Sequence, residues 1–256
     1  MFPFPPMTRF HIALIVTALL GAALVVSGNS IWLGAVAVGL VILVGLGVAI
    51  PHLSFFGPYV CKGDHARRCV ALTFDDGPDA NSTPALLDLL HEEKIEATFF
   101  CIGAKVARER ELAARMAREG HLLGNHTFSH SYATNFFSVA RLQDELTRTQ
   151  AVIHEAAGVV ARHFRPPVGL SNPRTFRAAR AVGLQVIGWS VRSLDTRIPE
   201  PERIVARIVQ RLKPGAIILL HDGNLPAERL VVTVKLLLAS LRARGYEVVR
   251  LDRMLS

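Results

Sequence analysis

The stretch AIILLHD, residues 216–222, places five apolar residues in a row before a histidine and an aspartate. An apolar run that does not alternate with polar residues is typical of a strand buried on both faces, as in a parallel sheet covered by helices. The stretch VALTFDD, residues 70–76, has a similar form and ends in two aspartates. Both stretches predict buried parallel strands with reactive side chains directly after them.

Outward from these stretches, short apolar runs alternate with amphipathic runs as far as the C-terminus. This change of period predicts a repeated strand–helix unit. We expect strands at residues 70–74, 97–102, 121–124, 163–164, 184–189, 216–220 and 246–249, and helices at 84–93, 107–119, 139–157, 173–182, 202–212 and 227–244. The sequence therefore predicts a parallel α/β barrel or a related open sheet in one domain of roughly 190 residues, a size that supports one core.

The N-terminal part has a different composition. Arg9 is the only charged residue before Lys62, and residues 10–27 and 31–50 are uncharged runs of 18 and 20 residues. Each is near the ~20 residues that cross the hydrocarbon of a bilayer as a helix. The turn signal GNS between them predicts a transmembrane hairpin, with a cleaved signal peptide as the alternative. We expect a membrane hairpin at 1–50, a linker at 51–68 and a catalytic domain at 69–256.

Basic residues on both flanks of the hairpin bear on its orientation. Arg9 precedes the first run, and Lys62, Arg67 and Arg68 follow the second, so the positive-inside rule favours a cytoplasmic domain at a bacterial inner membrane. If Arg67 and Arg68 belong to the surface of the folded domain, an extracytoplasmic position stays open.

The net charge of +8 and the pI near 10.0 are consistent with an anionic binding partner. No basic patch is interleaved with aromatic residues, so we expect an anionic membrane surface or a phosphate-bearing substrate rather than nucleic acid. Cys61 and Cys69 could form a small disulfide loop in an oxidising space, while Cys101 is expected in the core. The sequence gives no indication of an oligomeric state.

Polar side chains gather directly after the predicted strands. They are Asp75 and Asp76, His126 and His130, Arg165, Asp195, and His221 with Asp222. Because the C-terminal ends of parallel strands converge on one face of a barrel, we expect these residues to share one site.

Three of these residues form a plausible metal-binding set. His126 and His130 can aim two imidazoles at one ion, and Asp76 adds a carboxylate, which leaves an open position. This ligand mix suits Zn²⁺, with Co²⁺ or Ni²⁺ as alternatives. Taken alone, an HxxxH pair is as often a structural pair of hydrogen-bonded histidines as a metal site. An Asp-Asp-Gly-Pro segment alone is often an ordinary turn.

The other residues suit proton transfer in amide hydrolysis. Adjacent side chains of an extended strand diverge, so we expect Asp75 to be the general base while Asp76 binds metal. An amine leaves only when protonated, and His221 is the candidate acid, with Asp195 to orient it and favour its charged form. Arg165 would pair with Asp75 and keep it ionised. Ordinary structural roles for His221 and Asp195 are the alternatives.

These motifs resemble those of the polysaccharide deacetylase family, carbohydrate esterase family four. The resemblance covers residues 70 to the C-terminus and rests on four ordered motifs: TFDDGP at 73–78, NHTFSH at 125–130, RPPVG at 165–169 and LLHD at 219–222. It implies a distorted (β/α)7-type parallel barrel, here preceded by two transmembrane helices.

The resemblance also implies roles for individual residues. It implies that Asp76, His126 and His130 bind a divalent ion, usually zinc. It implies that Asp75 is the base and His221 the acid. Arg165 would hold the base in place, and Asp195 would be the partner of the histidine. Trp189 and Leu219 match positions near the acetyl methyl pocket. Val168 stands where the family usually has Tyr, next to a backbone N–H that the family uses for the oxyanion. Arg192 and Thr196 stand where Asp and Trp are common, a departure that concerns substrate preference rather than the chemistry.

The sequence thus predicts a metal-dependent N-deacetylase that removes an acyl group, acetyl above all, from an amino sugar. The short distance to the membrane favours an N-acetylated glycan or glycolipid that is lipid-linked, and peptidoglycan or nascent exopolysaccharide if the domain faces outward. A metal-dependent phosphohydrolase and a catalytically inactive membrane scaffold are the alternatives.

Overall fold

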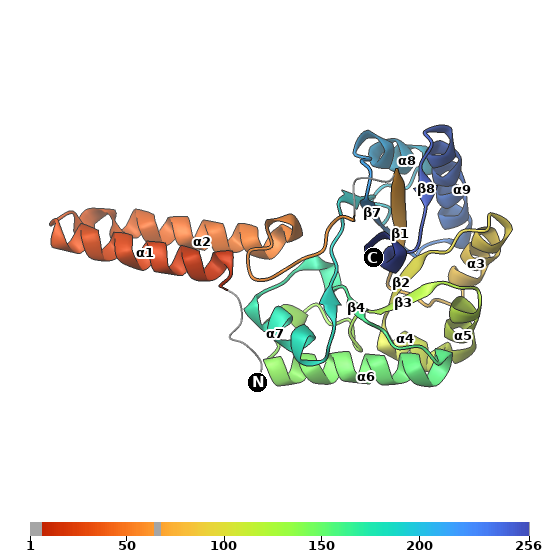
Figure 1. The fold of residues 1–256 in the computed structure, drawn as a ribbon, viewed down its shortest axis with the longest axis horizontal. Coiled ribbons are helices and arrows are strands. Elements are labelled where there is room, and N and C mark those ends of the chain that lie inside the picture. Colours follow the sequence, from red (N-terminus) through yellow and green to blue (C-terminus); the bar gives the residue numbers. More distant parts are fainter. Residues whose placement is uncertain (1–6, 64–67, 256) are drawn as a thin grey trace.

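Two apolar helices, α1 (Arg9–Val26) and α2 (Leu33–Ala49), lie side by side and project from the rest of the chain as a hairpin in the computed structural model, which describes residues 7–63 and 68–255 (Figure 1). A short 3-10 helix, η1 (Ser30–Trp32), lies in the turn between them. No side chain of α1 is buried, and both segments have the length and hydropathy of membrane spans.

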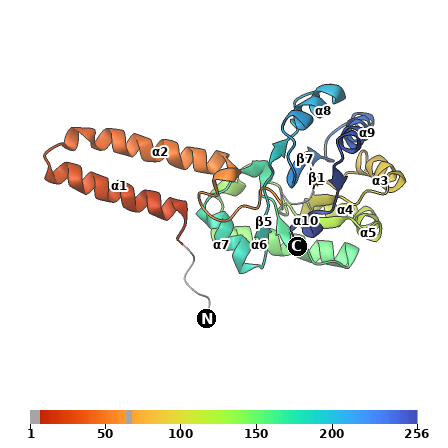
Figure 2. The same cartoon turned by 45° about the horizontal axis from the view of Figure 1, so that its top comes forward.

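The strands form one curled sheet in which every strand pair is parallel (Figures 1 and 2). Their bounds are β1 (Cys69–Asp75), β2 (Thr98–Cys101), β3 (Leu122–Asn125), β4 (His163–Phe164), β5 (Gln185–Val186), β6 (Val191–Arg192), β7 (Ala216–His221) and β8 (Glu247–Val248). Their order in space is β5-β4-β3-β2-β1-β7-β6, and β8 also pairs with β1. This curled half-barrel confirms the predicted parallel α/β architecture.

Helices cover the outer face of the sheet (Figure 2). They are α3 (Thr83–Glu92), α4 (Gly103–Arg108), α5 (Arg110–Arg118), α6 (Val139–Ala157), α7 (Pro173–Ala181), α8 (Pro201–Gln210) and α9 (Ala227–Ala243), and the chain also has short 3-10 helices η2 (Pro51–Leu53), η3 (Thr134–Phe136) and η4 (Pro167–Gly169). The last helix, α10 (Leu251–Leu255), packs on the inner face of the curl instead. Alternation along a strand separates two faces. Leu72 and Phe74 of β1 pack in the core under the helices, whereas Ala71 packs inside the curl with Phe100 and Ile217.

Two predicted elements differ from the structure. The strand expected at residues 184–189 is shorter, β5 at 185–186, and an unexpected strand, β6, follows at 191–192; these two strands are the two ends of the sheet, and the barrel is open between them. The single helix expected at 107–119 is broken at Glu109, which has non-helical angles (φ −109°, ψ 50°) and separates α4 from α5. The sequence has neither Gly nor Pro at this break, and the amphipathic pattern continues through it, so the pattern predicts one helix where the structure has two.

The segment after the hairpin is packed on the domain. Phe10 at the start of α1 lies against Phe55 and Phe56, and the N–H of Phe10 donates to the carbonyl of Phe55 at 3.0 Å. Val60 forms a parallel bridge with Ile187 beside the open edge of the sheet. The expected linker at 51–68 therefore contributes buried side chains and a strand-like contact as far as Gly63, and its part at 64–67, which includes Arg67, lies outside the described residues.

The three cysteines are buried. Cys61 and Cys69 do not form a disulfide in this structure, and Cys101 lies in the core as expected.

Candidate metal centre and active site

The predicted site residues come together at the C-terminal ends of the central strands. Asp75, the last residue of β1, lies in register with His221, the last residue of β7. On the other side of β1, strand β3 leads directly into the segment that carries His126 and His130. Adjacent parallel strands are ~4.8 Å apart, so residues separated by more than 140 positions in sequence become neighbours.

Asp76, His126 and His130 form a compact cluster of metal-binding groups. The Nε2 atoms of His126 and His130 lie 3.4 Å and 3.1 Å from Oδ1 of Asp76. One ligand atom from each residue lies within 4.8 Å of the others. Burial alone would raise the pKa of Asp76, but hydrogen bonds and positive charge from the two histidines lower it well below the ordinary value.

The hydrogen bonds of His126 fix which of its nitrogens faces this cluster. Its Nδ1–H donates to the carbonyl of Arg165 at 2.7 Å, which leaves Nε2, the atom beside Asp76, as the nitrogen that can bind an ion. A backbone carbonyl in this position is the usual orienting partner of a metal-bound histidine. The donor set therefore fits a divalent ion, with two imidazole nitrogens and one carboxylate oxygen.

Glu145 of α6, which sequence reasoning did not single out, holds the segment between the two histidines. Its carboxylate accepts from the N–H groups of Phe128 and Ser129 at 2.9 and 2.8 Å, and from the Ser129 hydroxyl at 2.9 Å. Glu145 is buried, and a buried carboxylate with three donors fixes a loop firmly. The signal in the sequence was only a glutamate on the apolar face of a predicted helix.

Asp75 is held by a fully buried arginine. Nη1 of Arg165 donates to Oδ1 of Asp75 at 2.7 Å and to Oγ1 of Thr73 at 2.8 Å, while Nη2 donates to the carbonyl of Gly188 at 2.8 Å. The guanidinium also lies 4.1 Å from the centroid of the Phe100 ring. Oδ2 of Asp75 lies 3.9 Å from Nε2 of His126, so its second oxygen faces the metal cluster.

His221 is paired with Asp195. Its Nδ1–H donates to Oδ1 of Asp195 at 2.8 Å, and its backbone N–H donates to Oδ2 of the same carboxylate at 2.8 Å. Burial would lower the pKa of His221, but the hydrogen bond and charge of Asp195, together with Asp75 and Asp76, raise it to about 9. A protonated imidazole in this orientation presents its Nε2–H toward the site.

Asp222 is a second residue whose role the sequence did not reveal. It is fully buried, its Oδ2 accepts from the Thr83 hydroxyl at 2.7 Å, and its backbone carbonyl accepts from Ser82. A side chain at Gly77 would collide with this carboxylate. Asp222 thus anchors the turn after Asp76 to the end of β7, and burial raises its pKa to about 7.

Unusual backbone angles concentrate around the site. Asp76, Thr127, His130, Val168 and Leu194 all have positive φ, between 48° and 74°. Non-glycine residues adopt this region at a cost, and β-branched residues rarely do. The positive φ of Asp76 takes the chain out of the strand after Asp75, so the two adjacent carboxylates can both face the cluster.

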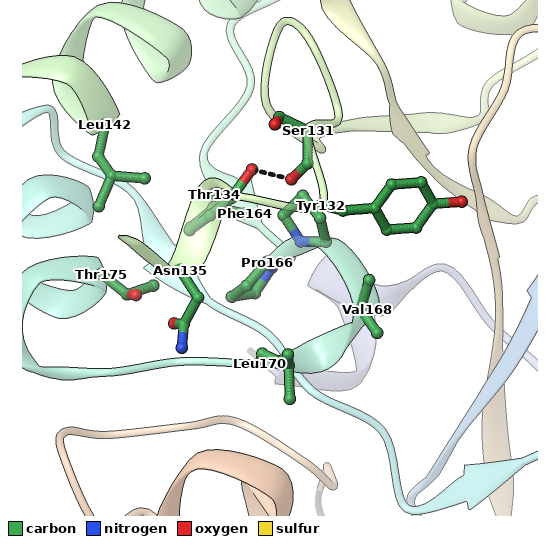
Figure 3. A pocket seen from close by; sticks show the side chains of 11 residues that line it. Ser131, Tyr132, Thr134, Asn135, Leu142, Phe164, Pro166, Val168, Leu170 and Thr175 are labelled. Atoms are coloured by element: carbon green, nitrogen blue, oxygen red, sulfur yellow. Dashed lines mark hydrogen bonds between the residues drawn. The ribbon is translucent and has the colours of Figure 1, made fainter. Parts of the chain in front are cut away.

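A shallow pocket adjoins the RPPVG segment (Figure 3). Tyr132 and Val168, both largely exposed, lie near each other at its edge in this view. None of the residues proposed for metal binding or proton transfer lines the pocket, which is formed by Ser131, Tyr132, Thr134, Asn135, Leu142, Phe164, Pro166, Pro167, Val168, Leu170 and Thr175.

Comparison with known proteins places this geometry in a family. A family model described as polysaccharide deacetylase matches residues 62–187. A peptidoglycan-N-acetylglucosamine deacetylase of Bacillus cereus is 37% identical over 191 residues, which are 74% of this chain and 89% of the relative. A chitooligosaccharide deacetylase of a Bradyrhizobium species is 37% identical over 193 residues, 71% of this chain and 88% of the relative.

A solved structure agrees with the sequence relatives. The crystal structure of a peptidoglycan N-acetylglucosamine deacetylase matches with a TM-score of 0.73 at 29% identity, over 77% of this chain and 92% of that one. The chain therefore belongs to the polysaccharide deacetylase family, carbohydrate esterase family four, and is a hydrolase of carbon–nitrogen bonds in carbohydrates.

Proposed function

We propose that the protein is a membrane-attached, metal-dependent enzyme that removes the N-acetyl group from an amino sugar of a glycan. The observation that carries the proposal is the joint placement of three ligand groups, an arginine-held aspartate and an aspartate-held histidine at one end of the sheet. Relatives named as deacetylases of peptidoglycan and of chitooligosaccharides support the N-acetylated glycan as substrate class.

Asp76, His126 and His130 would hold the ion. A bound divalent cation supplies Lewis acidity, which polarises an acyl carbonyl and makes water more acidic. Two imidazole nitrogens and a carboxylate oxygen suit Zn²⁺ best, with Co²⁺ and Ni²⁺ as alternatives.

Asp75 is the proposed general base. The pairing with Arg165 fixes one oxygen, and the other oxygen faces the metal cluster, where it can accept a proton from water as the oxygen attacks the acyl carbon. The bond that forms is C–O, and the bond that breaks is the C–N bond of the amide.

His221 is the proposed general acid. Its Nδ1–H is engaged by Asp195, so a protonated ring donates the Nε2 proton to the departing nitrogen. The products are a free amine and acetic acid, which loses its remaining proton to solvent and leaves as acetate. The proton lost by water and the proton gained by the amine balance, and Asp75 and His221 return to their starting states after one proton exchange with solvent.

We infer that the hairpin α1–α2 spans the membrane. The large apolar side chains of these helices, among them Ile15, Leu19 and Val41, are exposed in the structure, which is unfavourable in water and favourable in lipid. Basic residues on both flanks, Arg9 and Lys62, favour a cytoplasmic domain by the positive-inside rule. The packing of Phe10 on Phe55 and Phe56 keeps the domain close to the bilayer, and this favours a lipid-linked glycan.

Release of acetate by the purified, full-length protein in detergent tests the proposal. We expect acetate from chitooligosaccharide or peptidoglycan fragments, loss of this activity with a chelator and its return with Zn²⁺. In cells, lipid-linked glycans should lose acetyl groups with the wild-type protein and keep them with Asp75→Asn. If acetylation of these lipids is unchanged while the fragments still release acetate in vitro, only the lipid-linked substrate is rejected. Release of phosphate without release of acetate would favour a phosphohydrolase.

The pH dependence of the reaction should report His221. Because its pKa is raised to about 9, the protonated acid persists through neutral pH, and kcat/KM, which reports the free enzyme, should fall roughly tenfold per pH unit above that value. Asp195→Asn keeps a hydrogen-bond acceptor but removes the charge that raises the pKa, so the alkaline fall should move toward the ordinary value of 6.5. Acetate release measured from pH 6 to about 10.5 checks this, and an identical alkaline limb in both proteins would contradict the assignment of His221.

A further inference from the structure

Arg192 lies on the same face of the sheet as the proposed active-site residues. It is the second residue of β6 and is in register with Leu219 of β7, while its neighbour Val191 is in register with Ile218. Val191 and Ile218 both pack in the core under the helices, so alternation turns Arg192 toward the inside of the curl. Because the barrel is open beside β6, this inward side chain remains exposed to solvent.

The register also sets how far Arg192 is from the reacting groups. His221 lies two residues beyond Leu219 on β7, which is ~7 Å along a strand. Trp189 connects the two regions: its ring lies 5.9 Å from the guanidinium of Arg192 and 5.8 Å from that of Arg165, which holds Asp75. Arg192 therefore lies on the strand next to the one that carries His221, and its guanidinium and that of Arg165 contact the same indole ring.

No carboxylate neutralises Arg192 in the described parts of the chain, residues 7–63 and 68–255. Two further arginines approach the same segment, and both bond to main-chain carbonyls: Nε of Arg207 donates to the carbonyl of Arg192 at 3.1 Å, and Nη2 of Arg229 donates to that of Asp195 at 3.2 Å. The side chain of Asp195 is occupied by His221. Burial and the charges of Arg211 and Arg192 lower the pKa of Arg207, as expected where positive charges gather without a counter-ion.

We propose that Arg192 binds an anionic group, a phosphate or a carboxylate, carried by the acylated sugar or by the residue next to it. Like charges collected on one part of a protein surface raise the local concentration of anionic ligands, and a guanidinium pairs with two oxygens of such a group at once. Arg207 and Arg229 add positive potential, while Arg192 makes the direct contact. This inference deepens the proposed function and rests on it.

Three matched disaccharides test the proposal with the full-length protein in detergent and Zn²⁺ present. They are neutral di-N-acetylchitobiose, its 1-phosphate, and the N-acetylglucosaminyl-N-acetylmuramic acid disaccharide, which carries a carboxylate. We expect the wild-type kcat/KM to be roughly tenfold higher for at least one anionic sugar, the gain of one charged bidentate contact. This preference should shrink as salt rises from about 0.05 to 0.5 M, because salt screens exposed charges. The comparison of the two anionic arms identifies which group is preferred.

The variants separate a specific contact from general surface charge. Arg192→Gln, which keeps much of the aliphatic stem over Trp189, should bring the ratio of anionic to neutral kcat/KM close to one. Arg203→Gln removes an exposed arginine of the neighbouring helix α8 that pairs with Glu200, and it should keep the wild-type ratio. A wild-type ratio near one in both arms, or an unchanged ratio in Arg192→Gln, overturns the inference while leaving the deacetylase proposal standing. Absence of acetate from all three sugars overturns both.

Discussion

Replacement of Asp75 by Asn is expected to slow deacetylation by roughly 10³-fold, within the range that general base catalysis contributes. Asn has the same shape, and its carbonyl oxygen can still accept the hydrogen bond from Arg165 that Oδ1 accepts at 2.7 Å. It cannot take a proton from water. Steady-state acetate release at saturating substrate and Zn²⁺ measures the effect, and the loss should appear in kcat, because substrate and ion still bind.

Two controls make this result specific. Metal content per chain should stay at the wild-type value, because Asp75 is not among the three grouped ligands. Asp88→Asn changes an aspartate whose side chain is 65% exposed and pairs with Arg115 on the surface, and it should keep the full rate. An Asp75→Asn protein that retains a third or more of the activity would show that another group accepts the proton.

Replacement of Asp76 by Ala is expected to remove both metal binding and activity. The carboxylate lies within 3.4 Å of both imidazole nitrogens, and its loss leaves two ligands where a stable site requires three or more. Deacetylation should fall at least about 10⁴-fold, because loss of the ion removes Lewis acid catalysis as well as orientation. Added Zn²⁺ should restore chelator-treated wild-type protein and leave the variant inactive.

Thermal unfolding provides a readout that does not depend on turnover. An ion that binds the folded state stabilises it by mass action, so Zn²⁺ should raise the Tm of the wild-type protein and leave that of Asp76→Ala unchanged. His154→Ala, at an exposed position of α6, is the matched histidine control and should respond as the wild type does. An equal Zn²⁺-dependent rise in Asp76→Ala would place the ion elsewhere.

The order of the elements was predictable from local patterns. Buried parallel strands leave uninterrupted apolar runs, and the helices beside them leave amphipathic ones, so residues 139–157 were expected as a helix and are α6 (Val139–Ala157). Strand β6 was not expected, because a strand of only two residues has no period; the equally short β4, β5 and β8 lie within the strands expected at 163–164, 184–189 and 246–249. The break at Glu109 between α4 and α5 carries no residue that disfavours a helix.

The candidate site also contains residues that the sequence predicted and residues that it did not. Every residue expected in it lies at or shortly after the C-terminal end of a strand, and the structure brings together Asp75, Asp76, His126, His130, Arg165, Asp195 and His221. Their chemical roles stay predictions that the variants above address. Glu145 was not singled out, and Asp222 was expected near the site without a role, because their partners lie 16 or more positions away and no local pattern reports which backbone N–H or hydroxyl a buried carboxylate will meet.

The sequence by itself therefore determined the parallel α/β fold, the apolar N-terminal hairpin and the edge of the sheet at which polar residues collect, because each depends on short-range burial and on the rule that parallel strands end on the same side. Only the tertiary structure decided how the side chains are oriented and which groups they contact. Asp76 turns to the ligand cluster through a left-handed backbone angle, the tautomer of His126 is set by a carbonyl of Arg165, and the opening between β5 and β6 leaves Arg192 without a counter-ion in the described residues. These depend on contacts between distant elements, which appear only when the chain is folded.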